Sequence, residues 1–213
     1  MTVSQIIQNI SIFAASCSVF YGINAWKREY RGKRQIELAE NTLALFYEAI
    51  EAIKNIRCPM SFSSETDKIK RNEGEDDKQF EARKNAFVVF NRYEAYNELF
   101  SKIHALRYRF MAQIGKKQSA PFDELRDVIN EILGSARRLS RLWAQQQFSN
   151  DKQRDRHFSK IEKYEAVFWD GYEDDIDPIN PKVEKLLLDI EKTCQSIISG
   201  KKTRFNILNW KKN

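Results

Sequence analysis

The chain has 213 residues, of which 31% are charged, with a net charge of +6 and only seven glycines and four prolines. Because sandwiches, barrels and tightly looped α/β enzymes need Gly and Pro in their turns, this shortage argues against those classes and predicts a mostly helical protein. The charged fraction and the 12% of aromatic residues exclude a disordered chain and a polytopic membrane protein.

The first 26 residues contain no charged side chain, and the first charge is Lys27. As a helix, residues 3–26 would reach about 36 Å, enough to cross a hydrocarbon core of about 30 Å. The basic segment 27–35 follows at once, and the positive-inside rule places such a segment in the cytoplasm. We therefore predict a membrane anchor at 1–26, a single transmembrane helix of the inner (cytoplasmic) membrane, with its N-terminus outside and the rest of the chain cytoplasmic. The predicted anchor residues are Ile6, Ile7, Ile10, Ile12, Phe13, Val19, Phe20, Ile23 and Trp26, and the lipid-facing basic residues are Lys27, Arg28, Arg31, Lys33 and Arg34.

Two other interpretations of this segment stay open, a buried or oligomer-forming helix and a signal peptide. Gln8, Asn9 and Asn24 are polar. The best apolar stretch, residues 10–23, would cover only about 21 Å, a length more typical of buried core helices and signal-peptide cores. A signal peptide would need basic residues before its apolar core, and none precedes Lys27. The buried or oligomer-forming helix is therefore the stronger alternative to the anchor.

A stripe of small residues runs along one face of the predicted anchor. Ala14, Ser18 and Gly22 recur every four residues. Such stripes let two membrane helices approach closely, so we predict that this face supports homo-oligomerisation. The alternative is that small residues are simply frequent in membrane anchors.

The stretch after the basic segment has a helical hydrophobic period. Apolar residues recur at alternating steps of three and four, the a/d pattern of a coiled coil or bundle seam. Pro59 disfavours helical geometry in the residue before it, so this helix is predicted to end at about Arg57. The stripe consists of Ile36, Ala39, Leu43, Phe46, Ile50 and Ile53.

Further helices are predicted between turn and capping signals. Ser119 followed by Pro121 is a typical helix start, and Gly115 and Gly200 each mark a helix end. The predicted helices cover about 78–114, 119–148 and 157–169, with a last one from 181 to Gly200; exposed loops lie at 58–77 and 170–181. The fold class is therefore all-α, an N-terminal transmembrane or buried apolar helix that continues into an antiparallel bundle of about four helices over 36–200.

The search for chemistry finds no catalytic, cofactor-binding or metal-binding motif. His104 and His157 lie on different predicted helices, and Cys17, Cys58 and Cys194 are far apart, so no zinc spacing is present. The aromatic-rich run 87–100 is interpreted as core packing because of its helical period. The carboxylates of the acidic loop do not follow an EF-hand pattern, and we interpret them as a solvated loop or a contact for a basic partner: Asp170, Glu173, Asp174, Asp175 and Asp177.

The positive charge is confined to two short segments. Residues 27–34 carry +4 and the tail 201–213 carries +5, which leaves −3 for residues 35–200. The basic residues of the tail bracket an apolar patch, a composition that suits an anionic lipid surface and argues against nucleic acid as the partner. The predicted lipid-facing residues of the tail are Lys201, Lys202, Arg204, Lys211 and Lys212.

These patterns predict a non-enzymatic, membrane-anchored helical interaction or scaffold module, without cofactor, that meets an anionic lipid surface and a protein partner at the cytoplasmic membrane face. One rival is a membrane-perturbing effector of a stress or phage response whose anchors self-assemble; the polar residues of the anchor favour it. Another rival is a soluble helical protein with its N-terminal helix buried in an oligomer.

Overall fold

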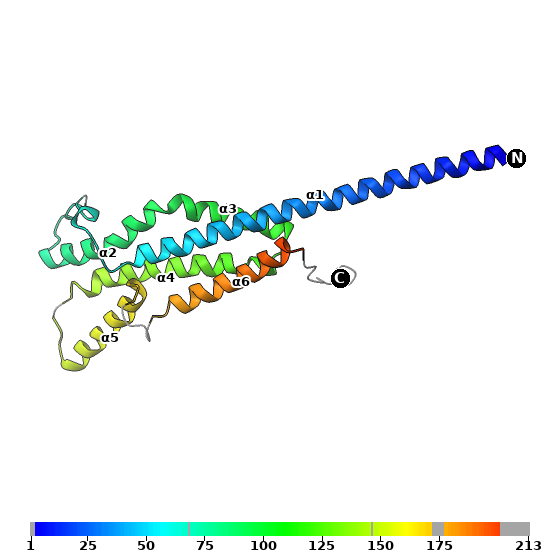
Figure 1. The fold of residues 1–213 in the computed structure, drawn as a ribbon. Helices are drawn as coiled ribbons and strands as arrows, with labels where there is room; N and C mark the ends of the chain where they lie inside the picture. The colour runs from blue at the N-terminus through cyan, green and yellow to red at the C-terminus, as the bar shows by residue number, and fades with distance from the viewer. Residues whose placement is uncertain (1–2, 68, 146, 172–176, 201–213) are drawn as a thin grey trace. The chain divides into compact units, whose positions relative to one another are not determined.

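The computed structural model describes residues 3–67, 69–145, 147–171 and 177–200, and every regular element in these ranges is helical (Figure 1). The predicted all-α class is therefore confirmed, but these ranges hold six α-helices where about four were predicted. The helices are α1 Val3–Arg57, α2 Asp77–Ala95, α3 Asn97–Gln113, α4 Ala120–Leu142, α5 Asp151–Phe168 and α6 Asn180–Ile198, with 3-10 turns at Ser63–Glu65 and Lys117–Ser119.

The chain divides into two compact units. One unit comprises Met1–Asn41 with Cys194–Asn213, and the other comprises Thr42–Thr193. In the first unit Cys194 is fully buried, and burial raises the pKa of its thiol to about 12, so the thiol stays protonated at neutral pH. The second unit holds the helical bundle that the following paragraphs describe.

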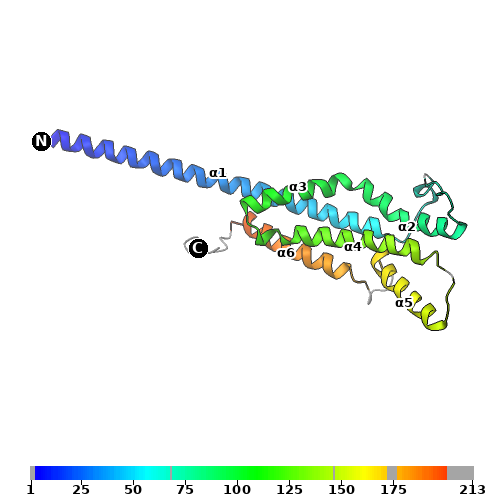
Figure 2. The ribbon, with the colours of Figure 1, turned by 180° about the vertical axis from the view of Figure 1, so that it is seen from behind.

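Helix α4 is the centre of the bundle. Both α2 and α5 pack against it, and α3 precedes it in a helical hairpin closed by the 3-10 turn (Figures 1 and 2). Its Phe122 meets Phe46 of α1 with ring centroids 4.9 Å apart and Phe110 of α3 at 5.2 Å. Each buried apolar side chain of this kind contributes about 1.5–3 kcal/mol. The buried apolar face of α4 consists of Phe122, Leu125, Val128, Ile129, Ile132, Ala136 and Leu139.

The single helix predicted over 78–114 is wrong, because the chain breaks at Tyr96 into α2 and α3. Tyr96 leaves helical geometry, at φ −103° and ψ 8°, and its hydroxyl accepts a hydrogen bond from Asn55 Nδ2 at 3.0 Å. The backbone N–H of Phe100 still donates to Tyr96 O at 3.1 Å. The apolar residues therefore keep their spacing of three and four across Tyr96. For this reason the break between α2 and α3 could not be predicted from the hydrophobic period.

The third predicted helix is also corrected, since α4 ends at Leu142 and not at Phe148, and the next helix starts at Asp151. Asn150 caps α5: its side chain accepts a hydrogen bond from Gln153 N at 2.8 Å. This cap satisfies a free N–H at the helix start. Residues 151–156, which lie before the predicted helix 157–169, therefore form its exposed first turns.

Most described residues of the loop 58–77 are exposed, although Thr66 is buried, and much of the loop is fixed to α2. Arg92 donates to Glu65 Oε1 at 2.8 Å and to the carbonyls of Cys58 and Met60 at 2.6 Å each. Further along the loop, Arg83 Nε donates to Glu75 Oε1 at 2.7 Å. Two arginines on one helix therefore hold both ends of a loop that has no apolar period of its own.

These ion pairs predict that the loop weakens in acid. Hydrogen bonds from Arg83 lower the pKa of Glu75 to about 2, and hydrogen bonds from Arg92 lower the pKa of Glu65. Because both folded pKa values lie below the usual glutamate value of about 4.5, the carboxylates stabilise the fold above that pH. This stabilisation is lost as the pH falls through the folded pKa values, which for Glu75 is about 2. We expect urea midpoints to fall less steeply between pH 5 and pH 3 in the double variant E65Q/E75Q than in the unmodified chain.

The matched control is E73Q, a change at an exposed glutamate of the same loop. It should leave the slope of stability against pH as it is in the unmodified chain. Equal slopes in all three proteins would contradict the assignment of this pH dependence to the two arginine pairs.

Candidate functional site

The N-terminal part of α1 exposes a run of large apolar side chains. Their exposed fractions range from 44% to 73%, values far above those of core residues. The next turns expose the basic residues Lys27, Arg28, Arg31, Lys33 and Arg34. An apolar segment therefore borders a cationic one on a continuous helix. The exposed apolar residues are Ile12, Phe13, Val19, Phe20, Tyr21, Ile23 and Trp26.

Within the part of the chain that the structure describes, no helix combines the length and the apolar character that crossing a membrane requires. The transmembrane span predicted from the sequence is thus not confirmed. The side chains of residues 1–11 and 14–17 lie outside the described ones, and with them the predicted positions Ile6, Ile7, Ile10 and Ala14. The tail 201–213, with Lys201, Lys202, Arg204, Lys211 and Lys212, also lies outside the described residues.

The small-residue stripe is open where the structure describes it. Ser18 and Gly22 are exposed, and a Cβ built on Gly22 would meet no atom within 4 Å. Close approach of a second helix at this face therefore stays a prediction.

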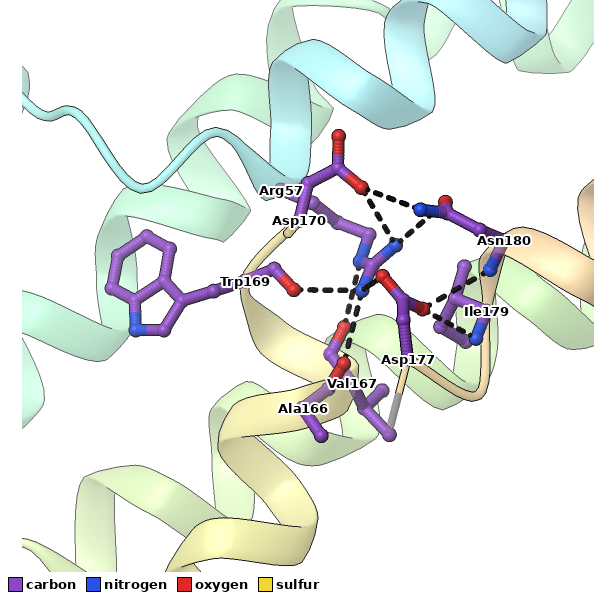
Figure 3. Close-up of polar contacts among 8 residues, drawn as sticks. All are labelled: Arg57, Ala166, Val167, Trp169, Asp170, Asp177, Ile179 and Asn180. Atoms are coloured by element: carbon purple, nitrogen blue, oxygen red, sulfur yellow. Dashed lines mark hydrogen bonds and ion pairs between the residues drawn. The ribbon is translucent and has the colours of Figure 1, made fainter. Parts of the chain in front are cut away.

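A buried arginine connects three helix ends in the bundle (Figure 3). Arg57, at the end of α1, is fully buried, and all of its guanidinium nitrogens are used. Its own carbonyl also accepts the N–H of Asp170 at 2.8 Å. The guanidinium donates to Val167 O at 2.9 Å, Ala166 O at 3.0 Å, Trp169 O at 2.7 Å, Asp177 Oδ2 at 2.8 Å, Asn180 Oδ1 at 3.2 Å and Asp170 Oδ1 at 3.4 Å.

Three of these contacts satisfy backbone carbonyls that the end of α5 leaves free. The three carbonyls belong to the last turn of α5 or its cap, where a positive charge is favourable. The second carboxylate oxygen of Asp177 accepts the N–H groups of Ile179 and Asn180, at 2.8 and 3.1 Å, at the start of α6. Arg57 and Asp177 together therefore join the end of α5 to the beginning of α6.

The acidic loop 170–181 was predicted to be solvated, but the described acidic residues on either side of 172–176 contact the bundle. Asp177 is buried and Asp170 is partly buried, and both pair with Arg57 in the bundle. Glu173, Asp174 and Asp175 lie outside the described residues. No group of three or more His, Cys, Asp or Glu in the described ranges is placed to hold a metal ion. Sequence reasoning missed Arg57 because a single arginine at a helix end carries no pattern.

The arginine connection predicts a large and specific loss of stability. Replacing Arg57 by Met leaves Asp177 as an uncompensated buried charge, which should lower the free energy of unfolding by about 3–5 kcal/mol. Lys54 lies one turn earlier and forms an exposed ion pair with Glu51, so K54M should cost no more than about 0.5 kcal/mol. Urea denaturation followed by circular dichroism measures both.

The double variant R57M/D177N removes both charges. It should lose less stability than the sum of the two single variants, because the buried charge that R57M strands is gone. Additive losses, or equal losses for R57M and K54M, would show that the cluster is not a coupled unit.

A cavity of about 330 Å³ lies between α3 and α4. Its walls come from α3, from the first half of α4 and from Tyr93 of α2. Tyr93 and Phe100 belong to the aromatic run 87–100, which was predicted to pack in the core. Tyr93 and Phe100 are only half-buried, and their rings stack with centroids 5.4 Å apart. The prediction of core packing for this run therefore holds for Val88, Val89 and Leu99 but not for these two rings.

The polar side chains of the cavity come together at one carboxylate. Asp123 accepts from Arg107 Nη2 at 2.7 Å on one oxygen and lies 3.2 Å from Arg126 Nη2 on the other. His104 also lines the cavity, whereas His157 is buried beside Phe148 at 4.8 Å between ring centroids. The sequence analysis did not predict this site, because its residues are spread over three helices, α2, α3 and α4, that only the folded chain brings together.

No family model, curated protein or solved structure matches the chain. Function must therefore be inferred from the exposed segment of α1, the arginine-linked bundle and the cavity.

Proposed function

We propose that this protein is a non-enzymatic interaction module held at the anionic cytoplasmic face of a membrane by the N-terminal part of α1. The observation that carries the proposal is the run of exposed apolar side chains between Ile12 and Trp26, followed directly by five exposed basic residues. Such a pair of segments suits the boundary between hydrocarbon and anionic head groups.

The free energies favour transfer of this segment out of water. Burial of a large apolar side chain contributes about 1.5–3 kcal/mol, and each basic residue near an anionic surface adds about 1 kcal/mol. The backbone is also compatible with hydrocarbon, since α1 is one unbroken helix from Val3 to Arg57 and its interior hydrogen bonds are made within the helix. We propose the single-pass arrangement, with the N-terminus outside and the bundle in the cytoplasm.

The loop 58–77 offers a surface for the protein partner. Met60 and Phe62 are 69% and 68% exposed, and Arg92 and Glu65 hold the loop that carries them. A fixed loop with exposed apolar side chains loses little conformational entropy on binding, which supports partner contact at this position.

Membrane association is tested by fractionation and carbonate extraction of the full chain. The unmodified protein should stay in the membrane pellet after carbonate treatment. The double variant F20K/I23K should move to the soluble fraction, because two charges at the centre of the segment make insertion unfavourable. The matched control L188K changes another exposed apolar residue, on α6, and should remain in the pellet.

Extraction of the unmodified protein by carbonate would contradict the proposal. So would retention of F20K/I23K in the pellet, since that result would place membrane attachment elsewhere.

A second candidate is a soluble oligomer in which another copy covers this segment. Ile12, Val19, Ile23, Trp26 and Tyr30 are all exposed and follow coiled-coil spacing along α1. In that case the protein would be recovered in the soluble fraction as a stable oligomer, and F20K/I23K would reduce its mass in light scattering without changing its fractionation.

A further inference from the structure

The cavity between α3 and α4 has the composition of a small-molecule site. Its volume of about 330 Å³ is within the usual range for such sites, which begins near 300 Å³. Tyr93, Phe100 and Phe122 contribute aromatic surface, and the aliphatic part comes from Ile103, Leu125 and Ile129. The apolar walls can therefore hold a ring or a short alkyl chain.

The polar end of the cavity carries an excess of positive charge. Two guanidinium groups, of Arg107 and Arg126, share the single carboxylate of Asp123. The two arginines and the aspartate together leave a net charge of +1. This charge matches a ligand with one negative charge, whereas a dianion would face repulsion from Asp123.

Arg107 also has hydrogen-bonding capacity to spare. Its side chain is 18% exposed, and its Nε is buried yet donates no hydrogen bond to any residue that the structure describes. Because Arg107 lines the cavity and is partly exposed, the accessible part of its guanidinium can donate hydrogen bonds to a ligand acceptor there. Arginine is also the side chain best suited to a planar carboxylate.

We propose that this cavity binds a small monocarboxylate with an apolar body. The carboxylate takes hydrogen bonds from Arg107 and Arg126, and the apolar body packs against Tyr93, Phe100 and Phe122. No described residue of α1 lines this cavity, so the proposal of a carboxylate site does not depend on membrane attachment.

The test is calorimetric titration of the full chain in mild detergent with four probes of similar size. These are 3-phenylpropionate, octanoate, the neutral alcohol 3-phenylpropanol and the dianion phenyl phosphate. At least one carboxylate should bind ten-fold or more tightly than both the alcohol and the phosphate. The ratio between the two carboxylates then distinguishes an aryl from an alkyl body. Equal binding of acid and alcohol, tighter binding of the phosphate, or no binding of either acid would overturn the proposal.

Two variants place the binding in the cavity. R107K keeps the positive charge but removes Nε and the planar fork, and should weaken the better carboxylate ten-fold or more. S101W fills the cavity from an exposed position, so it does not depend on rearranging the core, and should abolish binding. The control K102Q changes a neighbouring exposed lysine of α3 and should leave binding unchanged. Unchanged affinity in both R107K and S101W would overturn the proposal.

Discussion

A fully buried guanidinium limits how the bundle can be assembled. Arg57 ends α1, and removing its charge from water is tolerable only because carbonyls of α5, Asp177 and Asn180 replace the lost hydration. The carbonyls are available only if α5 ends where it does, and Asp177 is held only if α6 begins where it does. The end of α1, the end of α5 and the start of α6 are therefore fixed together by this one side chain.

Arginines play three different parts in the same bundle. Arg57 is buried and satisfied by helix ends, and Arg92 fixes an exposed loop by pairing with Glu65 and with backbone carbonyls. Arg107 shares a carboxylate with a second arginine and has a buried N–H left over. The first two explain why a chain with so few glycines and prolines still has well-defined connections. The third belongs to a group of two arginines and one aspartate that carries a net charge of +1.

Several elements could be predicted from the sequence because their signals are local. The end of α1 before Pro59, the start of α4 between Ser119 and Pro121, and the end of α6 before Gly200 all follow from backbone chemistry. The break at Tyr96 could not be predicted, since the apolar period continues through it. The Arg57 cluster joins residues that are more than a hundred positions apart in the sequence. The cavity forms only when the helices that line it pack together. Neither arrangement leaves a local signal in the sequence. The apolar start and its basic border could be predicted from the sequence. The structure adds that the large apolar side chains at 12–13 and 19–26 and the basic side chains at 27–34 are exposed.

The central claim is that the exposed part of α1 enters an anionic bilayer. It is tested most directly by a single environment-sensitive fluorophore, attached to a cysteine introduced at Phe20 in a chain whose native cysteines are replaced by serine or alanine. On reconstitution into vesicles of mixed neutral and anionic lipid, we expect a blue shift and quenching by lipids brominated deep in their acyl chains. The same label at Phe158, an exposed residue of α5, should show neither change. A label at position 20 that keeps its aqueous spectrum and is not quenched by the brominated lipids would contradict the account.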